Sequence, residues 1–149
     1  MVGCAGPRME PVETLSVPGT LQGVRQAIDA FERFGQRVHV PRRSQWRIQL
    51  ALDEILSNIV QYGVDDGVQP AIDVTFSFAD GVVSVEIVDT AAAFNPLLAP
   101  PPDTETPLER RPEGGLGIAL VRQLMDETTY ERRGNRNHFV MRCRAHGDS

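Results

Sequence analysis

Two polar side chains near the middle of the chain are the first candidates for chemistry. Glu54 and Asn58 stand four residues apart in a segment with helical periodicity, residues 44–63, so they project side by side from one helix. The amide oxygen of Asn58 can bind a hard cation such as Mg²⁺, and the carboxylate of Glu54 can accept a proton from a nucleophile. Taken alone, the pair favours a simpler interpretation, namely two solvated residues on a surface helix.

Two further stretches carry residues suited to binding. Asp89 ends an apolar run typical of a strand, where a carboxylate is costly unless it is paired or accepts hydrogen bonds, for example from the exocyclic amine of adenine. Gly114, Gly115 and Gly117 open a helical pattern, where backbone N–H groups can approach a phosphate. The alternatives are that Asp89 caps a turn and that the glycines give a flexible entry to the helix. A lone glycine-rich loop is weak evidence.

The elements that must position these residues follow from periodicity and turn signals. Residues 44–63 form a helix that Ser44 caps and Gly63 ends in the left-handed conformation. Its apolar stripe consists of Ile48, Leu52, Ile55 and Ile59. Two other helices are predicted over residues 20–34, closed by Gly35, and within residues 114–127. An extended connector is predicted at residues 38–41.

Alternating apolar residues predict the strands, and Asp80-Gly81 is a strong hairpin signal between two of them. The predicted strands span residues 13–19, 72–78, 83–88, 128–132 and 138–142. Together these elements predict an α+β fold, a two-layer sandwich in which helices cover one face of a mixed, mostly antiparallel sheet.

Length and composition limit the possibilities further. The 149 residues suit a single domain, predicted over residues 12–145 after a flexible tail at residues 1–11. A net charge of −5 argues against general binding of nucleic acid. All fifteen basic residues are arginine, which excludes lysine-dependent phosphate chemistry. The sequence shows neither a signal peptide nor a run of eighteen apolar residues, so a cytoplasmic protein that does not span a membrane is expected.

Taken in order, the three stretches resemble motifs of the GHKL ATP-binding superfamily, and within it the anti-sigma factor serine kinases of the RsbW and SpoIIAB type. LALDEILSNIVQYG is similar to the N box, VDTAAAFNP to the Asp-containing G1 box, and GGLGIALVRQLMDETTYERRGNRN to the G2 box with its following hairpin. The resemblance covers about residues 13–144. It implies a Bergerat-type ATP-binding fold.

The resemblance also implies roles for individual residues. Glu54 would be the general base that takes the proton from a substrate serine, Asn58 would ligate the Mg²⁺ that bridges the ATP phosphates, and Asp89 would bind the adenine amino group. Residues 95–114, rich in proline, would form a lid over ATP. The other nucleotide-binding positions it implies are Ala91, Ala93, Phe94, Gly114, Gly115, Leu116, Gly117 and Ile118.

Three positions depart from the family pattern. Gln61 stands where many relatives have His, and residues 139–141 lack the Thr that often contacts adenine in the family. The third departure concerns the G1 box. Ala91 stands where the G1 box usually has glycine, and a positive φ at an alanine would be strained by about 1 kcal/mol. This residue favours an alternative to the kinase, namely a binding module that keeps the ATP fold and sequesters its partner stoichiometrically. Glu54 and Asn58 count against that alternative, because a sequestering protein needs no base. An ATP hydrolase is a third reading, disfavoured because the short chain has no second domain.

The resemblance therefore predicts an ATP-dependent protein-serine kinase in a partner-switching circuit, with ATP and Mg²⁺ as cofactors. It would phosphorylate a serine on a STAS-type anti-sigma antagonist and sequester a sigma factor or similar regulator. A homodimer is also implied, with no direct contact to nucleic acid and none to a membrane.

Overall fold

The computed structural model describes residues 11–63, 67–93, 95 and 115–145, and of residues 115–118 the backbone only. Most of the predicted tail and of the predicted lid lies outside these residues. The strands are β1 Val12–Pro18, β2 Ala71–Ala79, β3 Val82–Asp89, β4 Glu127–Arg133 and β5 Arg136–Arg144. The helices are α1 Leu21–Arg37, α2 Arg42–Tyr62 and α3 Gly115–Leu124. None of these helices is both long and apolar enough to cross a lipid bilayer.

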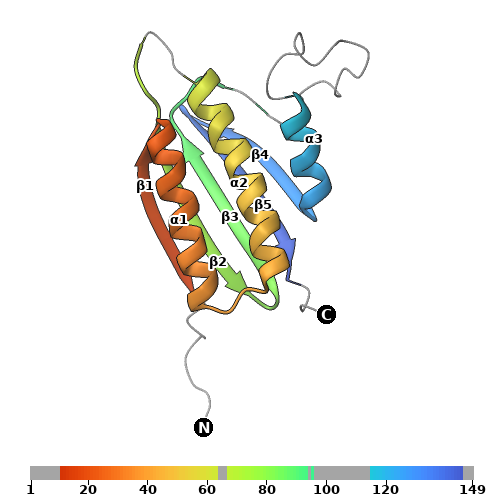
Figure 1. Ribbon diagram of the computed structural model, residues 1–149. Coiled ribbons are helices and arrows are strands. Elements are labelled where there is room, and N and C mark those ends of the chain that lie inside the picture. The colour runs from red at the N-terminus through yellow and green to blue at the C-terminus, as the bar shows by residue number, and fades with distance from the viewer. Residues whose placement is uncertain (1–10, 64–66, 94, 96–114, 146–149) are drawn as a thin grey trace.

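The five strands form one sheet in the order β1-β2-β3-β5-β4, and every pairing between them is antiparallel. All three helices lie on the same face of this sheet, with α2 between α1 and α3 (Figure 1). The expected two-layer α+β sandwich is confirmed. On the face away from the helices, the positions that alternate with the core are mostly polar, as at Thr75 and Glu86.

The core lies between the helices and the sheet. Phe31 and Phe34 of α1 pack against Phe76 of β2, with the Phe31 and Phe76 rings edge to face at a centroid distance of 5.2 Å. Leu52 and Ile48 of α2 are fully buried beside them. Because α2 is anchored by this stripe, its polar side chains are held at fixed positions relative to the sheet.

The end of α1 differs from the prediction. The helix continues through Gly35 to Arg37, and it ends with His39 at a φ of 62° and a bond from the Val40 N–H to the Gly35 carbonyl of 2.8 Å. The connector is therefore a tight turn, not an extended segment. Gly35 packs closely against α2, because a Cβ there would come within 2.9 Å of the Gln45 side chain, which would have to shift.

Both predicted ends of α2 also need correction. The helix begins at Arg42 after Pro41, and Ser44 is buried inside the first turn without the expected role at the start of the helix. Pro41 occupies the N-cap position with a φ of −55°, so no side-chain hydroxyl caps the first turn. The helix does end at Gly63, but with a φ of −91°, which is not left-handed.

The predicted hairpin between β2 and β3 is confirmed, with positive φ at Asp80 and Gly81 as a tight two-residue turn requires. Its register brings Asp89 opposite Ile72, and the β3–β5 pairing brings Asp89 opposite Asn137. Asp89 thus stands at the end of a central strand, at the end of the sheet where α2 finishes (Figure 1).

Candidate functional site

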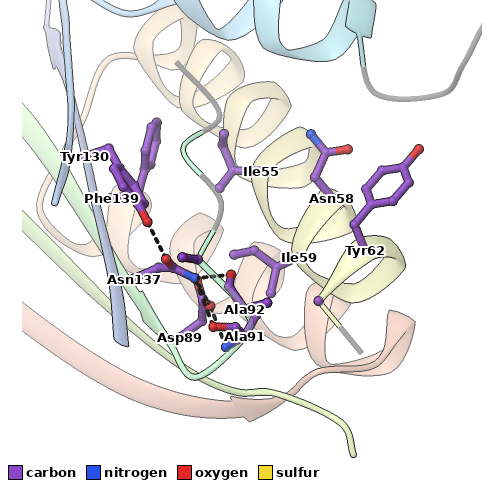
Figure 2. A pocket seen from close by; sticks show the side chains of 12 residues that line it. Ile55, Asn58, Ile59, Tyr62, Asp89, Ala91, Ala92, Tyr130, Asn137 and Phe139 are labelled. Atoms are coloured by element: carbon purple, nitrogen blue, oxygen red, sulfur yellow. Dashed lines mark hydrogen bonds between the residues drawn. The ribbon is translucent and has the colours of Figure 1, made fainter. Parts of the chain in front are cut away.

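A cavity of about 180 Å³ opens between α2 and the ends of the central strands (Figure 2). On the helix side it is lined by Ile55, Asn58, Ile59, Tyr62 and Gly63. On the sheet side it is lined by Asp89, Ala91, Ala92, Ala93, Tyr130, Asn137 and Phe139. An apolar protein cavity of about 150 Å³ holds a benzene ring, so this one has room for a flat aromatic ring system.

Asp89 supplies a buried carboxylate at the bottom of this cavity, with 3% of its surface exposed. Its Oδ1 accepts the backbone N–H of Ala91 at 2.9 Å, a local turn that aspartate favours, and the Asn137 side-chain N–H at 2.9 Å. Burial raises the pKa of Asp89, although the hydrogen bonds from Asn137 and Ala91 and the charge of Arg132 oppose this shift. The predicted turn-capping role and a binding role are therefore compatible.

Asp89, Ala91, Ala92 and Asn137 form the floor of the cavity, and Asn137 is hydrogen-bonded to each of the others. Its Nδ2 donates to Asp89 and to the carbonyls of Ala92 at 3.0 Å and Ala91 at 3.3 Å, while its Oδ1 accepts from the Tyr130 hydroxyl at 2.5 Å. Figure 2 shows the Asn137 amide pointing at this group of acceptors. The orientation follows from chemistry, because carbonyls and carboxylates accept only.

Arg132 of β4 strengthens the same floor from outside the cavity. Its Nη1 donates to the Ala91 carbonyl at 2.9 Å and to Asn137 Oδ1 at 3.1 Å, and its Nε donates to the Gly134 carbonyl at 3.2 Å. Ala91 is consequently held at both of its backbone polar groups, by Asp89 at the N–H and by Arg132 at the carbonyl.

The strain expected at Ala91 is absent. Among the described non-glycine residues only His39 and Asp80 have a positive φ, so Ala91 adopts an ordinary backbone conformation. The close approach that glycine permits occurs instead on α2. A Cβ at Gly63 would lie 2.8 Å from the Ala91 Cβ and would clash with the Ile59 carbonyl oxygen, so Gly63 makes room for the Ala91 methyl group.

Glu54 and Asn58 lie on the same side of α2, one turn apart. Asn58 lines the cavity and is 8% exposed. Glu54 is half-buried and is not among the residues that line the cavity. Burial, and to a lesser extent the charge of Asp53, raises the pKa of Glu54. A carboxyl with a raised pKa is better suited to accept a proton near neutral pH than a free one.

The remaining predicted residues divide into three groups. Ala93 lines the cavity with Ala91. Gly115, Leu116, Gly117 and Ile118 form the first turn of α3, which confirms the predicted helix start, while their side chains are not described. Phe94 and Gly114 lie outside the described residues.

Sequence reasoning missed Asn137, the best-connected residue of the site. The signal was present in the alternation of β5, because Phe139, Met141 and Cys143 are buried and Asn137 continues their spacing of two. The register of the β3–β5 pairing then places Asn137 opposite Asp89. Tyr62 and Tyr130 were also not predicted as cavity residues.

Comparison with known proteins agrees with this geometry. The model of the histidine kinase-like ATPase domain family matches residues 17–143. The serine/threonine-protein kinase BtrW of Bordetella bronchiseptica is 30% identical over 129 residues, which cover 87% of this chain and 91% of BtrW. The serine-protein kinase RsbW of Bacillus mycoides is 30% identical over 84 residues, covering 54% of this chain and 52% of RsbW.

Among solved structures, that of the RsbU and RsbW domains of Rv1364c from Mycobacterium tuberculosis superposes with a TM-score of 0.66. The match covers 90% of this chain and 32% of that longer chain, at 16% identity, and therefore shows a common fold.

The fold and the site thus define an ATP-binding protein of the GHKL type. This chain belongs to the histidine kinase-like ATPase domain family, on the branch of the RsbW-type protein-serine/threonine kinases.

Proposed function

We propose that this chain is an ATP-dependent protein-serine kinase of a partner-switching circuit, with the adenine of ATP in the cavity beside Asp89. The observation that carries the proposal is a buried carboxylate at the bottom of a cavity of ring size. Such a carboxylate is costly to bury, and a ligand with an exocyclic amine supplies the hydrogen bond that offsets the cost.

The walls of the cavity suit a purine. Ile55 and Ile59 on α2 face Phe139 on β5 across it, so both faces of a flat ring would meet apolar side chains (Figure 2). These side chains exclude water from Asp89, which strengthens the hydrogen bond that Asp89 accepts. The backbone N–H groups of the first turn of α3 are available for phosphate, as at other helix N-termini.

Asn58 and Glu54 are the proposed metal ligand and base. The Asn58 side-chain oxygen suits Mg²⁺, which prefers oxygen ligands and takes few from the protein when nucleotide phosphates supply the rest. Bound Mg²⁺ would neutralise charge on the phosphates. Glu54, one turn away on the same side of α2, would take the proton from the attacking serine hydroxyl. Phosphoryl transfer depends mainly on positioning and electrostatic stabilisation, so these groups are nearly sufficient.

The proposed substrate is a serine on a STAS-type anti-sigma antagonist, and the proposed second partner is a sigma factor or similar regulator. Support comes from the likeness to BtrW and RsbW, both named as serine or serine/threonine kinases, and to a chain that combines RsbU and RsbW domains. We also propose a homodimer in the cytoplasm, on the same family likeness.

The test compares wild type, Glu54→Gln and Asp53→Asn. Each is assayed for Mg-ATP binding and for transfer of labelled phosphate to small STAS-domain proteins encoded beside the gene. We expect wild type and Asp53→Asn to bind ATP and label a substrate, and Glu54→Gln to bind ATP with a loss of transfer of at least about 100-fold. Wild type that holds its partners without binding ATP would instead identify a sequestering module.

A further inference from the structure

We propose that Arg132 and Asn137 are positioning residues that hold the cavity floor in a shape selective for adenine over guanine. The inference deepens the proposed function and rests on it, because it takes adenine as the ring that occupies the cavity.

Asn137 lines the cavity, but its side-chain amide forms hydrogen bonds within the protein. Its Nδ2 donates to Asp89 and to the carbonyls of Ala91 and Ala92, and its Oδ1 accepts from Tyr130 and Arg132. An asparagine side chain has two N–H donors and one oxygen with two lone pairs, so these bonds use its capacity. Asn137 therefore acts on a bound base through Asp89 and not by direct hydrogen bonding.

Arg132 completes the arrangement without touching the cavity. It is not among the lining residues, yet its Nη1 binds both the Ala91 carbonyl and Asn137 Oδ1. Since the Ala91 N–H is bound to Asp89, the chain of contacts runs from Arg132 through Ala91 and Asn137 to one carboxylate oxygen. Loss of Arg132 would remove one hydrogen bond from each route, so that Asn137 Oδ1 would keep its bond from Tyr130 and the Ala91 carbonyl its bond from Asn137.

These contacts determine which carboxylate oxygen of Asp89 can accept a hydrogen bond from the base. Both described hydrogen bonds end on Oδ1, which leaves Oδ2 as the atom that accepts from the base. Adenine presents an N–H donor at its sixth position and guanine presents an oxygen acceptor there. A fixed, ionised carboxylate accepts from the first and repels the second. A carboxylate that can rotate presents its oxygens less well to the adenine amine, and only a carboxyl that binds a proton can donate to the guanine oxygen.

The experiment uses the full-length chain with Arg132→Met, Arg132→Lys and Arg133→Met. Arg133 is the matched control, because it follows Arg132 on β4, carries the same charge and pairs only at the surface with Glu131 at 2.9 Å. Kd values for Mg-ATP and Mg-GTP are measured by calorimetry, with the thermal midpoint of each variant as the folding check.

For Arg132→Met we expect the Kd for ATP to rise about tenfold, which corresponds to about 1.4 kcal/mol, while the Kd for GTP changes less than about twofold. The preference for ATP over GTP then falls about tenfold. Arg132→Lys, which keeps the charge and a donor, should recover part of the preference, and Arg133→Met should match wild type.

Several outcomes would overturn the inference. If Arg132→Met keeps the wild-type preference for ATP over GTP, or weakens the binding of both nucleotides equally, Arg132 does not position Asp89 for base selection. Should Arg132→Met not fold, Tyr130→Phe decides in its place, because it removes only the hydroxyl that binds Asn137. If wild type binds no nucleotide, the proposed function fails together with the inference. If wild type prefers ATP and the variants keep that preference, the inference fails while the proposed function is retained.

Discussion

The pKa of Glu54 depends on its burial in the fold and on its neighbour Asp53 in α2. Burial is the larger cause of the raised pKa of Glu54, and the adjacent charge of Asp53 adds to it. Asp53 is itself exposed and accepts a hydrogen bond from Ser57 at 3.0 Å. Its charge can therefore be removed without disturbing the core.

We predict that Asp53→Asn shifts the acidic limb of the kinase pH–rate profile to lower pH. Transfer requires ionised Glu54, so the rate falls as the pH drops through the pKa of Glu54, and removal of a like charge lowers that pKa. Rates of phosphate transfer between about pH 5 and pH 8 would measure the shift. Asp73→Asn, which removes a carboxylate on β2 that accepts a hydrogen bond from the Ser16 hydroxyl of β1, is the matched control. An unmoved limb in Asp53→Asn would argue against Glu54 as the base.

The backbone conformation of Ala91 leads to a second prediction for a single residue. Because its φ is not positive, replacement by glycine relieves no strain, while it adds freedom to the unfolded chain and removes a buried methyl group. Ala91→Gly should lower the free energy of unfolding by about 1–2 kcal/mol and change the Kd for ATP less than about twofold. Denaturant unfolding and calorimetry would measure both. A large gain in ATP affinity would mean that the alanine impairs the site.

Between elements, the contact that matters most for the site is the one between the end of α2 and the loop after β3. Gly63 ends the helix, and its N–H binds the Ile59 carbonyl at 2.7 Å. The absence of a side chain lets the Ala91 methyl group approach the helix axis. The helix that carries Asn58 and the strand end that carries Asp89 are brought to one cavity by this contact.

Gly63→Ala is predicted to destabilise the fold by about 1–3 kcal/mol and to weaken ATP binding at least tenfold, because the added methyl group meets backbone at Ile59 and the Ala91 side chain. Gly81→Ala is the control. Gly81 has a φ of 74° in the β2–β3 turn, at the other end of β3 from Asp89, so its replacement costs stability without altering the cavity. Equal ATP affinity in the two variants would contradict the prediction.

Much of the element layout could be predicted from the sequence, for a physical reason. Strands with one buried face alternate at period two, and Ile72, Val74 and Phe76 show it plainly. The placement of Glu54 and Asn58 on one side of a helix could be predicted because helical spacing is local. Helix ends were predicted less well. Gly35 and Ser44 were assigned from local preference, whereas tight packing between α1 and α2 decides their positions.

Asn137 was missed for a different reason. Its partners Asp89, Ala91 and Ala92 are more than forty residues away along the chain, so only strand register brings them together. Register depends on pairing across the whole sheet, which a single sequence specifies only through its turns.

For the molecule as a whole, the burial of Asp89 that suits the proposed binding of adenine also lowers the stability of the fold near neutral pH. Burial raises the pKa of Asp89. The contribution of such a group to the stability of the folded state is fully present below about pH 4, where Asp89 is protonated in both the folded and the unfolded chain. This contribution is lost as the pH rises through the raised pKa. Asparagine at this position could keep both bonds to its oxygen and would carry no charge at any pH.

We therefore predict that Asp89→Asn melts at a higher temperature than wild type near pH 7, and that this difference shrinks as the pH falls toward 4. The same variant should lose the rise in melting temperature that Mg-ATP gives wild type, because an amide N–H would face the adenine amine. In wild type, excess EDTA should reduce that rise by removing Mg²⁺. Thermal melts across pH, with and without Mg-ATP, would test this, and a variant that ATP still stabilises would exclude Asp89 as the adenine contact.

The asymmetry between Gly63 and Ala91 has a consequence for how this lineage can vary. A methyl group is accommodated on the loop, whereas one on the helix would strike backbone that cannot move aside. Orthologues should therefore exchange glycine and alanine at position 91 while keeping glycine at position 63. Searches that require glycine two residues after the aspartate would discard such chains as degenerate, and a search keyed to the glycine that closes the helix would retain them.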